Sequence, residues 1–173
     1  MRTFFYVAIL LGFGLTAACS ASEPSVQAEA TSLSVTVLMD DELSVEAVEE
    51  GAMGAFAEEH REVITDAETF ETRWSALHSH RTEVPEPPSV DFDERVVVLA
   101  ALGQRSTGGY RITLDRAVHD TEEGTVELTM REVRPGQGCM VQQVLTFPYL
   151  LATVEAVDAS YEFVEGEPRE ADC

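Results

Sequence analysis

Short runs of alternating apolar and polar residues follow one another from about Ala55 to Gly166. Alternation with a period of two residues is typical of half-buried β-strands. The run from Val96 to Leu102 is apolar throughout, which predicts a central strand covered on both faces. The strands expected from these patterns cover residues 55–64, 96–102, 110–118, 126–133, 140–146, 150–157 and 161–164.

A helical period appears once, directly after the first of these strands. Phe70, Trp74 and Leu77 are spaced at i, i+4 and i+7, so they lie on one face of a helix expected over residues 67–79. Trp74 is the single tryptophan of the chain. Its place on the apolar face predicts that it anchors the helix in the core.

The helix has a recognisable start, because Thr65 and Glu68 have the spacing of a capping box. A proline-rich connection over residues 83–89 follows it. The fold class expected from these elements is mostly β (β-rich α+β). In architectural terms it is an antiparallel sandwich or barrel-like sheet of about seven strands with one packed helix.

The first 18 residues have the pattern of an export signal. A short positive start precedes an apolar run of 12 residues from Phe4 to Leu15, which is shorter than the roughly 20 residues of a spanning helix. The small residues before Cys19 resemble a bacterial lipobox. We therefore expect a lipoprotein signal peptide and a lipidated Cys19. The alternative is an ordinary secretory signal, cut near Ala18 or Ala21.

Residues 19–54 are rich in Ser, Ala and Glu and contain no basic residue. This composition predicts an acidic, largely disordered tether. Within it, Leu33 to Met39 alternates well enough to form an added edge strand, which is the alternative for that segment. The β-rich domain is then expected over residues 55–166, followed by a C-terminal tail over residues 167–173.

The composition is strongly acidic. The chain has 32 Asp and Glu residues against 11 basic ones, all of them Arg, and a formal net charge of −21. Such a charge repels phosphate backbones, so nucleic acid is not an expected partner. An acidic surface without Lys is typical of a halophilic composition, because a Debye length of about 3 Å in 1 M salt screens the self-repulsion.

Two glycine-rich loops carry the candidate binding residues. Glycines permit a tight reversal between strands, and polar side chains at a loop tip are placed to donate hydrogen bonds. If both loops lie at the same end of a sandwich, they form one recognition edge. The alternative for the first loop is a rigid turn that fixes strand pairing. The candidates are Arg105, Ser106, Thr107, Gly108, Gly109 and Tyr110 in the first loop and Arg134, Pro135, Gly136 and Gly138 in the second.

The cysteines point to a cross-link in the exported part of the chain. With Cys19 assigned to the lipid, Cys139 and Cys173 remain, and two thiols in an exported domain favour a disulfide. The alternative is a buried thiol at Cys139 and an unpaired Cys173.

No motif indicates catalysis. The chain lacks the G-x-S-x-G, H-E-x-x-H, P-loop and G-x-G-x-x-G patterns. His78 and His80 form a pair that is more typical of a helix surface than of a zinc site. We therefore expect no catalytic residue, no metal and no cofactor.

The loops and their neighbours resemble the PrcB C-terminal domain family, which is named after an accessory subunit of a secreted bacterial protease complex. The resemblance spans roughly residues 55–157 and implies a non-catalytic, exported domain that helps to assemble or stabilise such a complex. Its motifs are a GxxxTGGY loop (Gly103, Thr107, Gly108, Gly109 and Tyr110), a P-x-x-G-C segment (Pro135, Gly138 and Cys139) and a downstream P-Y (Pro148 and Tyr149).

The first loop is also similar to the NPTTGY loop of chagasin-type cysteine-protease inhibitors, although the Asn-Pro is missing here. The leading hypothesis is a non-enzymatic lipoprotein of the cell envelope that faces the periplasm or exterior and binds a protein partner, such as a secreted protease or its complex. Membrane contact is expected only through the N-terminal lipid. The alternatives are a chagasin-like inhibitor that uses both loops and a small hydrolase.

Overall fold

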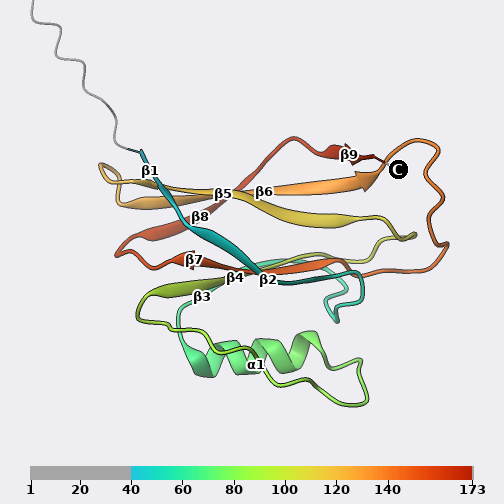
Figure 1. Cartoon of the computed structure of the whole chain (residues 1–173), viewed down its shortest axis with the longest axis horizontal. Helices are drawn as coiled ribbons and strands as arrows, with labels where there is room; N and C mark the ends of the chain where they lie inside the picture. Colours follow the sequence, from blue (N-terminus) through green and yellow to red (C-terminus); the bar gives the residue numbers. More distant parts are fainter. Residues whose placement is uncertain (1–39, 173) are drawn as a thin grey trace, which may run out of the picture. The chain divides into compact units, whose positions relative to one another are not determined.

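The computed structural model describes residues 40–172, which form nine strands and one helix (Figure 1). In chain order these are β1 (Asp40–Leu43), β2 (Val45–Gly51), β3 (Glu59–Ile64), α1 (Ala67–Leu77), β4 (Arg95–Leu102), β5 (Arg111–Asp120), β6 (Thr125–Pro135), β7 (Tyr149–Glu155), β8 (Ser160–Glu165) and β9 (Arg169–Ala171).

The strands form two sheets. Sheet A has the order β1-β5-β6-β8, and β9 also pairs with β6; sheet B has the order β2-β7-β4-β3. Neighbouring strands are antiparallel, except that β8 and β9 run parallel to β6. The predicted mostly β sandwich with one packed helix is confirmed, and the sheets do not close into a barrel.

β4 is covered on both faces, as its apolar sequence predicts. One set of its side chains joins the core between the sheets, and the alternate set joins a second core beneath the helix. The molecule therefore has three layers, with sheet B in the middle (Figure 1). The first set is Val96, Val98, Ala100 and Leu102, and the second is Val97, Leu99 and Ala101.

α1 packs on sheet B through Phe70, Trp74 and Leu77, the predicted apolar face. Its N-cap is Asp66, whose backbone is extended and whose carboxylate accepts from the amide of Thr69 at 2.9 Å. The predicted capping pair of Thr65 and Glu68 is thus replaced by Asp66 and Thr69, one residue later. A carboxylate interacts favourably with the positive end of the helix dipole, which explains the preference for Asp66.

The folded domain extends beyond its predicted limits at both ends. β1 and β2 lie within the segment 19–54 that was expected to be a tether, and β9 lies within the expected tail. The chain alternates here: Leu43 is buried and Val45 packs on the core, while Glu46 is exposed. Pairing with β5 and β7 supplies the remaining stabilisation. The predicted signal peptide, Cys19 and the alternative strand over residues 33–39 lie outside the described residues.

The strand expected over residues 140–146 does not form. These residues belong to the connection between β6 and β7, where Met140, Val144 and Leu145 are exposed rather than buried. Only Thr146 forms an isolated bridge, with Arg105. The alternation alone does not make a strand here, because these residues join neither sheet.

Candidate functional site

The two predicted loops lie at the same end of the sandwich. β5 begins at Arg111 and β6 ends at Pro135, and in their antiparallel register Arg111 is opposite Val133. The loop that precedes β5 and the segment that follows β6 therefore meet. We call this region, residues 103–110 and 136–148, the loop end; it lies on the right of Figure 1.

Backbone hydrogen bonds hold the two parts of the loop end together. The amide of Gly108 donates to the carbonyl oxygen of Gln142 at 2.9 Å, and Arg105 and Thr146 exchange bonds of 2.8 and 2.9 Å. The Thr146 hydroxyl donates to the carbonyl oxygen of Thr107 at 2.9 Å. The first loop is thus a fixed turn clamped to the segment after β6, which agrees with the structural alternative for it.

Gly109 is needed for this close approach. Its φ of +88° lies in the region that favours glycine. A Cβ at this position would lie 3.0 Å from side-chain carbons of Pro135 and Val141. Gly109 therefore permits the first loop to contact the second, whereas its neighbour Gly108 has no positive φ.

Arg105 does not project from the loop tip as expected. Its guanidinium donates to the carbonyl oxygen of Leu102 at 2.6 Å, and it lies 3.6 Å from carboxylate oxygens of both Glu59 and Glu132. Its Cζ also lies 5.8 Å from the centre of the Tyr110 ring. These contacts occupy Arg105 and pin the loop to the sandwich, so we assign it a structural role.

The other predicted residues are spread over the rim of the loop end. Ser106 is exposed, and Tyr110 packs against the core between the sheets. Arg134 is exposed and pairs with Glu132 at 3.3 Å, and the hydrogen bond with this carboxylate raises the pKa of the guanidinium. Glu132 thus holds one arginine from each predicted loop.

Cys139 is disulfide-bonded. Its predicted partner Cys173 lies outside the described residues, but the neighbouring chain is close: the Sγ atom of Cys139 lies 4.0 Å from the carbonyl oxygen of Ala171. A Cβ on Gly136 would lie 2.5 Å from the same oxygen. The C-terminal strand therefore packs directly against the second loop.

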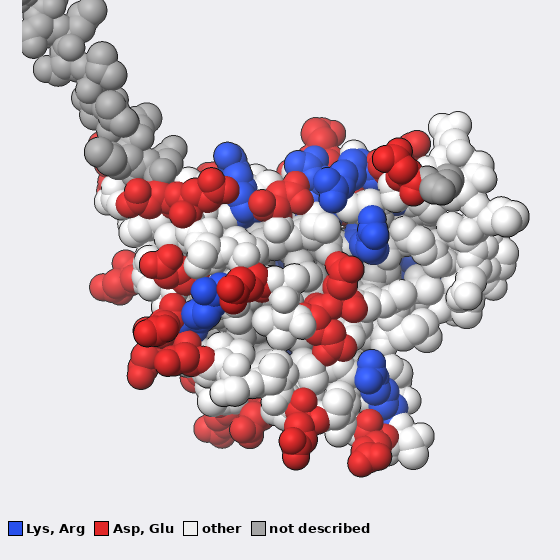
Figure 2. Space-filling model, viewed as in Figure 1, with Lys and Arg blue, Asp and Glu red and all other residues white. Residues whose placement is uncertain are grey.

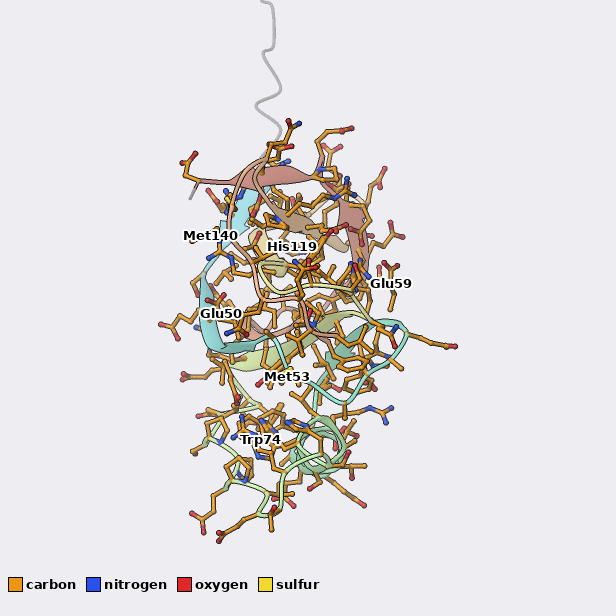
Figure 3. All side chains as sticks on the ribbon, turned by 90° about the vertical axis from the view of Figure 1, so that its right-hand side faces the viewer. Glu50, Met53, Glu59, Trp74, His119 and Met140 are labelled. Carbon is orange, nitrogen blue, oxygen red and sulfur yellow. The ribbon has the colours of Figure 1, made fainter. Side chains whose placement is uncertain are left out.

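A set of exposed apolar side chains at the loop end was not singled out from the sequence. Met140 is fully exposed, and Met53, Val144 and Leu145 are between 44% and 50% exposed. Met53 joins this set because it bridges to Phe147. Figure 3 looks straight at this end, with Met140 and Met53 labelled on it. A signal for it exists in the sequence, since residues 135–154 include no charged residue.

The absence of charge is local. Acidic side chains cover much of the molecule in Figure 2, whereas the right-hand end, where Figure 1 places the connection from β6 to β7, is almost free of them. An open groove of about 760 Å³ lies beside this surface. Its lining includes Tyr110, Arg111, Pro135, Val141 and Ala171.

Among residues 40–172, no group of three or more His, Cys, Asp or Glu side chains is arranged to hold a metal ion. Within the same range, α1 is too short and too polar to cross a membrane.

The fold and the loop end define a β-sandwich domain that presents a surface with few charged side chains, built by two clamped loops. Residues 96–155 match the family model described as PrcB C-terminal, which confirms the predicted family resemblance over this part of the chain. The match covers β4 to β7 and both loops, but neither α1 nor β1–β3. No curated protein and no solved structure matches the chain.

Proposed function

We propose that this protein is a non-enzymatic, exported lipoprotein whose domain binds a protein partner through the loop end. The family match supports an accessory role in a secreted protease complex. The observation that carries the proposal is the exposure of Met53, Met140, Val144 and Leu145 at an end of the domain with few charged side chains, in a chain with a large surplus of carboxylates. Exposed apolar patches with polar surroundings are typical of protein-binding surfaces.

The point at which the chain enters the folded domain supports this arrangement. β1 begins at Asp40, which is opposite Asp120 at the far end of β5, so the chain enters the domain away from the loop end. Twenty residues separate Asp40 from Cys19. Fully extended, they reach at most about 70 Å. A lipid on Cys19 would therefore be linked to the domain at the end opposite the loop end, which leaves the loop end accessible to a secreted or periplasmic partner.

The loop end is expected to lose its partner when its apolar side chains become charged. We expect Met140→Glu combined with Leu145→Glu to reduce partner recovery from native membranes at least tenfold, because desolvating two carboxylates opposes burial in an interface. Both side chains are exposed, so the melting temperature should stay within about 2 °C. Quantitative mass spectrometry of co-purified proteins measures the first quantity, and calorimetry the second.

Val164→Glu is the matched control for these variants. Val164 is 39% exposed and lies on β8, outside the loop end. Recovery by this control should equal that of the wild type. Equal recovery by the loop-end variant and the control, or no partner recovered by the wild type, would count against the proposal.

Inhibition of a protease is the second candidate, favoured by the meeting of the two loops at one end. In this case the two loops of the loop end insert into the active-site cleft of a protease. We therefore expect titration with the full chain to abolish the activity of a papain-like protease at equimolar amounts. Residual activity that stays flat at a tenfold excess would remove this candidate while leaving the accessory role unaffected.

A further inference from the structure

One half of β5 has an open edge. β1 pairs with β5 only from Ala117 to Asp120, and the chain then crosses into sheet B as β2. Within residues 40–172, no strand pairs with β5 on this side between Arg111 and Arg116. β1 is therefore too short to cover the whole edge of β5. The half of β5 that leads to the loop end has no neighbouring strand on that side.

The open edge presents backbone groups for pairing. Gly166 donates to the carbonyl oxygen of Met130 at 2.7 Å, so this carbonyl points from β6 toward β8 and away from β5. In an antiparallel ladder the residue opposite, Leu114, then directs its own N–H and C=O away from β6. Ile112, two residues earlier, does the same. Four backbone groups thus face the side of β5 that has no neighbouring strand.

A groove follows the same edge. A hollow of about 300 Å³ lies between Thr113–Asp115 of β5 and Val45 and Ala47 of β2, with Leu150 among its lining residues. It shares Glu50 with a smaller hollow, which shares Tyr110 and Arg111 with the groove at the loop end. Apolar side chains of an added strand would enter these hollows. Glu50, labelled in Figure 3, lines both of the smaller ones.

The charge at this edge differs from that of the rest of the domain. Seven of the ten arginines in residues 40–172 have a carboxylate within 4.0 Å; within that range Arg111, Arg116 and Arg169 have none. Arg111 and Arg116 are exposed and stand at the two ends of the open stretch of β5. Asp115 between them is paired with Arg131. Of the other carboxylates near this edge, Glu50 lines the smaller hollow and Asp172 lines the groove at the loop end.

We propose that the open edge of β5 binds an extended segment of a partner protein, which adds to sheet A as a strand in line with β1. This inference rests on the proposed function of protein binding. Because of the bulge between Leu114 and Arg116, the six residues from Arg111 to Arg116 lie opposite five positions of β6, Val133 to Thr129. The segment recognised therefore carries carboxylates at i and i+4, opposite the two arginines, and apolar side chains at i+1 and i+3, facing the groove.

Synthetic peptides test this arrangement without the natural partner. The probe is acetyl-Thr-Glu-Val-Thr-Val-Glu-Thr-amide, and its matched control, Thr-Val-Glu-Thr-Glu-Val-Thr with the same ends, has the same composition but places carboxylates on the groove face. With the full chain at low salt, we expect the probe to bind at least tenfold more tightly than the control. It should also slow amide hydrogen exchange at Ile112 and Leu114 at least tenfold, as measured by NMR.

Charge reversal of the protein supplies the second test. Arg111→Glu combined with Arg116→Glu should weaken probe binding at least tenfold, because two favourable cross-strand charge pairs become repulsive. Arg169→Glu is the control, since Arg169 is also exposed and has no carboxylate within 4.0 Å among the described residues, but lies on β9. Equal affinity of the two peptides, or unchanged exchange at Ile112 and Leu114, would overturn the inference.

The two proposals fail separately. If the loop end captures a partner but the probe does not protect Ile112 and Leu114, strand addition is overturned and the proposed function stands. If the probe protects both amides but no partner is captured by the wild type, strand addition is supported and the proposed function is not.

Discussion

Replacing Trp74 by Ala is expected to lower the free energy of unfolding by about 3–5 kcal/mol, the usual cost of removing a buried aromatic side chain. Trp74 is 5% exposed, and its ring packs against Phe70 and His78 with centroid distances of 5.9 and 4.3 Å. Its indole N–H donates to the carbonyl oxygen of Pro85 at 2.7 Å. One side chain therefore joins α1, sheet B and the proline-rich connection.

Urea unfolding followed by far-UV circular dichroism measures this loss. Trp74→Phe should cost less, because it keeps an aromatic ring in the core and gives up only the bond to Pro85 and part of the buried area. Ser75→Ala is the control on the same helix, since Ser75 is exposed. A loss below about 1 kcal/mol for Trp74→Ala would contradict the anchoring role.

Local sequence patterns predicted the elements in which burial follows a regular pattern from residue to residue. β4 is apolar at every position from Val96 to Leu102 because it lies in the middle layer, and α1 shows its period because one face alone is buried. The meeting of the two loops also follows from local information. Strands that are consecutive and antiparallel bring the start of one and the end of the next to the same edge.

The remaining features depend on pairings between distant segments. β1 and β2 are rich in carboxylates, and what makes them strands is their pairing with β5 and β7, about 75 to 110 residues later. Likewise, the sequence alone does not show that Arg105 turns inward to Leu102, Glu59 and Glu132. The open edge of β5 arises because the chain leaves sheet A after Leu43, which no local period encodes.

These distant pairings explain how an acidic domain keeps an end with few charged side chains. Glu132, near the end of β6 that leads to the loop end, is paired with both Arg105 and Arg134. The segment after β6 has no strand partner of its own. Its apolar side chains are consequently held in solvent by the clamp to the first loop, which is the arrangement that a preformed binding surface requires.

Glu49→Ala is expected to destabilise the fold by about 2–4 kcal/mol, because it leaves the Tyr149 hydroxyl without its acceptor and the buried His78 ring without its Glu49 partner. The Oε1 atom of Glu49 accepts from the Tyr149 hydroxyl at 2.5 Å and lies 3.2 Å from Nε2 of His78. The His78 side chain is fully buried. Burial and the neighbouring Glu49 carboxylate raise the pKa of Tyr149, so its hydroxyl stays protonated as the donor.

The adjacent residue provides the control, because Glu50 lies on the same strand and carries the same charge but is exposed. Glu50→Ala should change the free energy of unfolding by no more than about 0.5 kcal/mol. Trp74 lies next to His78, so the fluorescence of this single tryptophan reports unfolding of both variants. Tyr149→Phe removes the hydroxyl that Glu49→Ala leaves without its acceptor. It should therefore lower the free energy of unfolding less in the Glu49→Ala background than in the wild type. Equal costs for Glu49→Ala and Glu50→Ala would show that the Glu49 carboxylate does not hold α1 to sheet B.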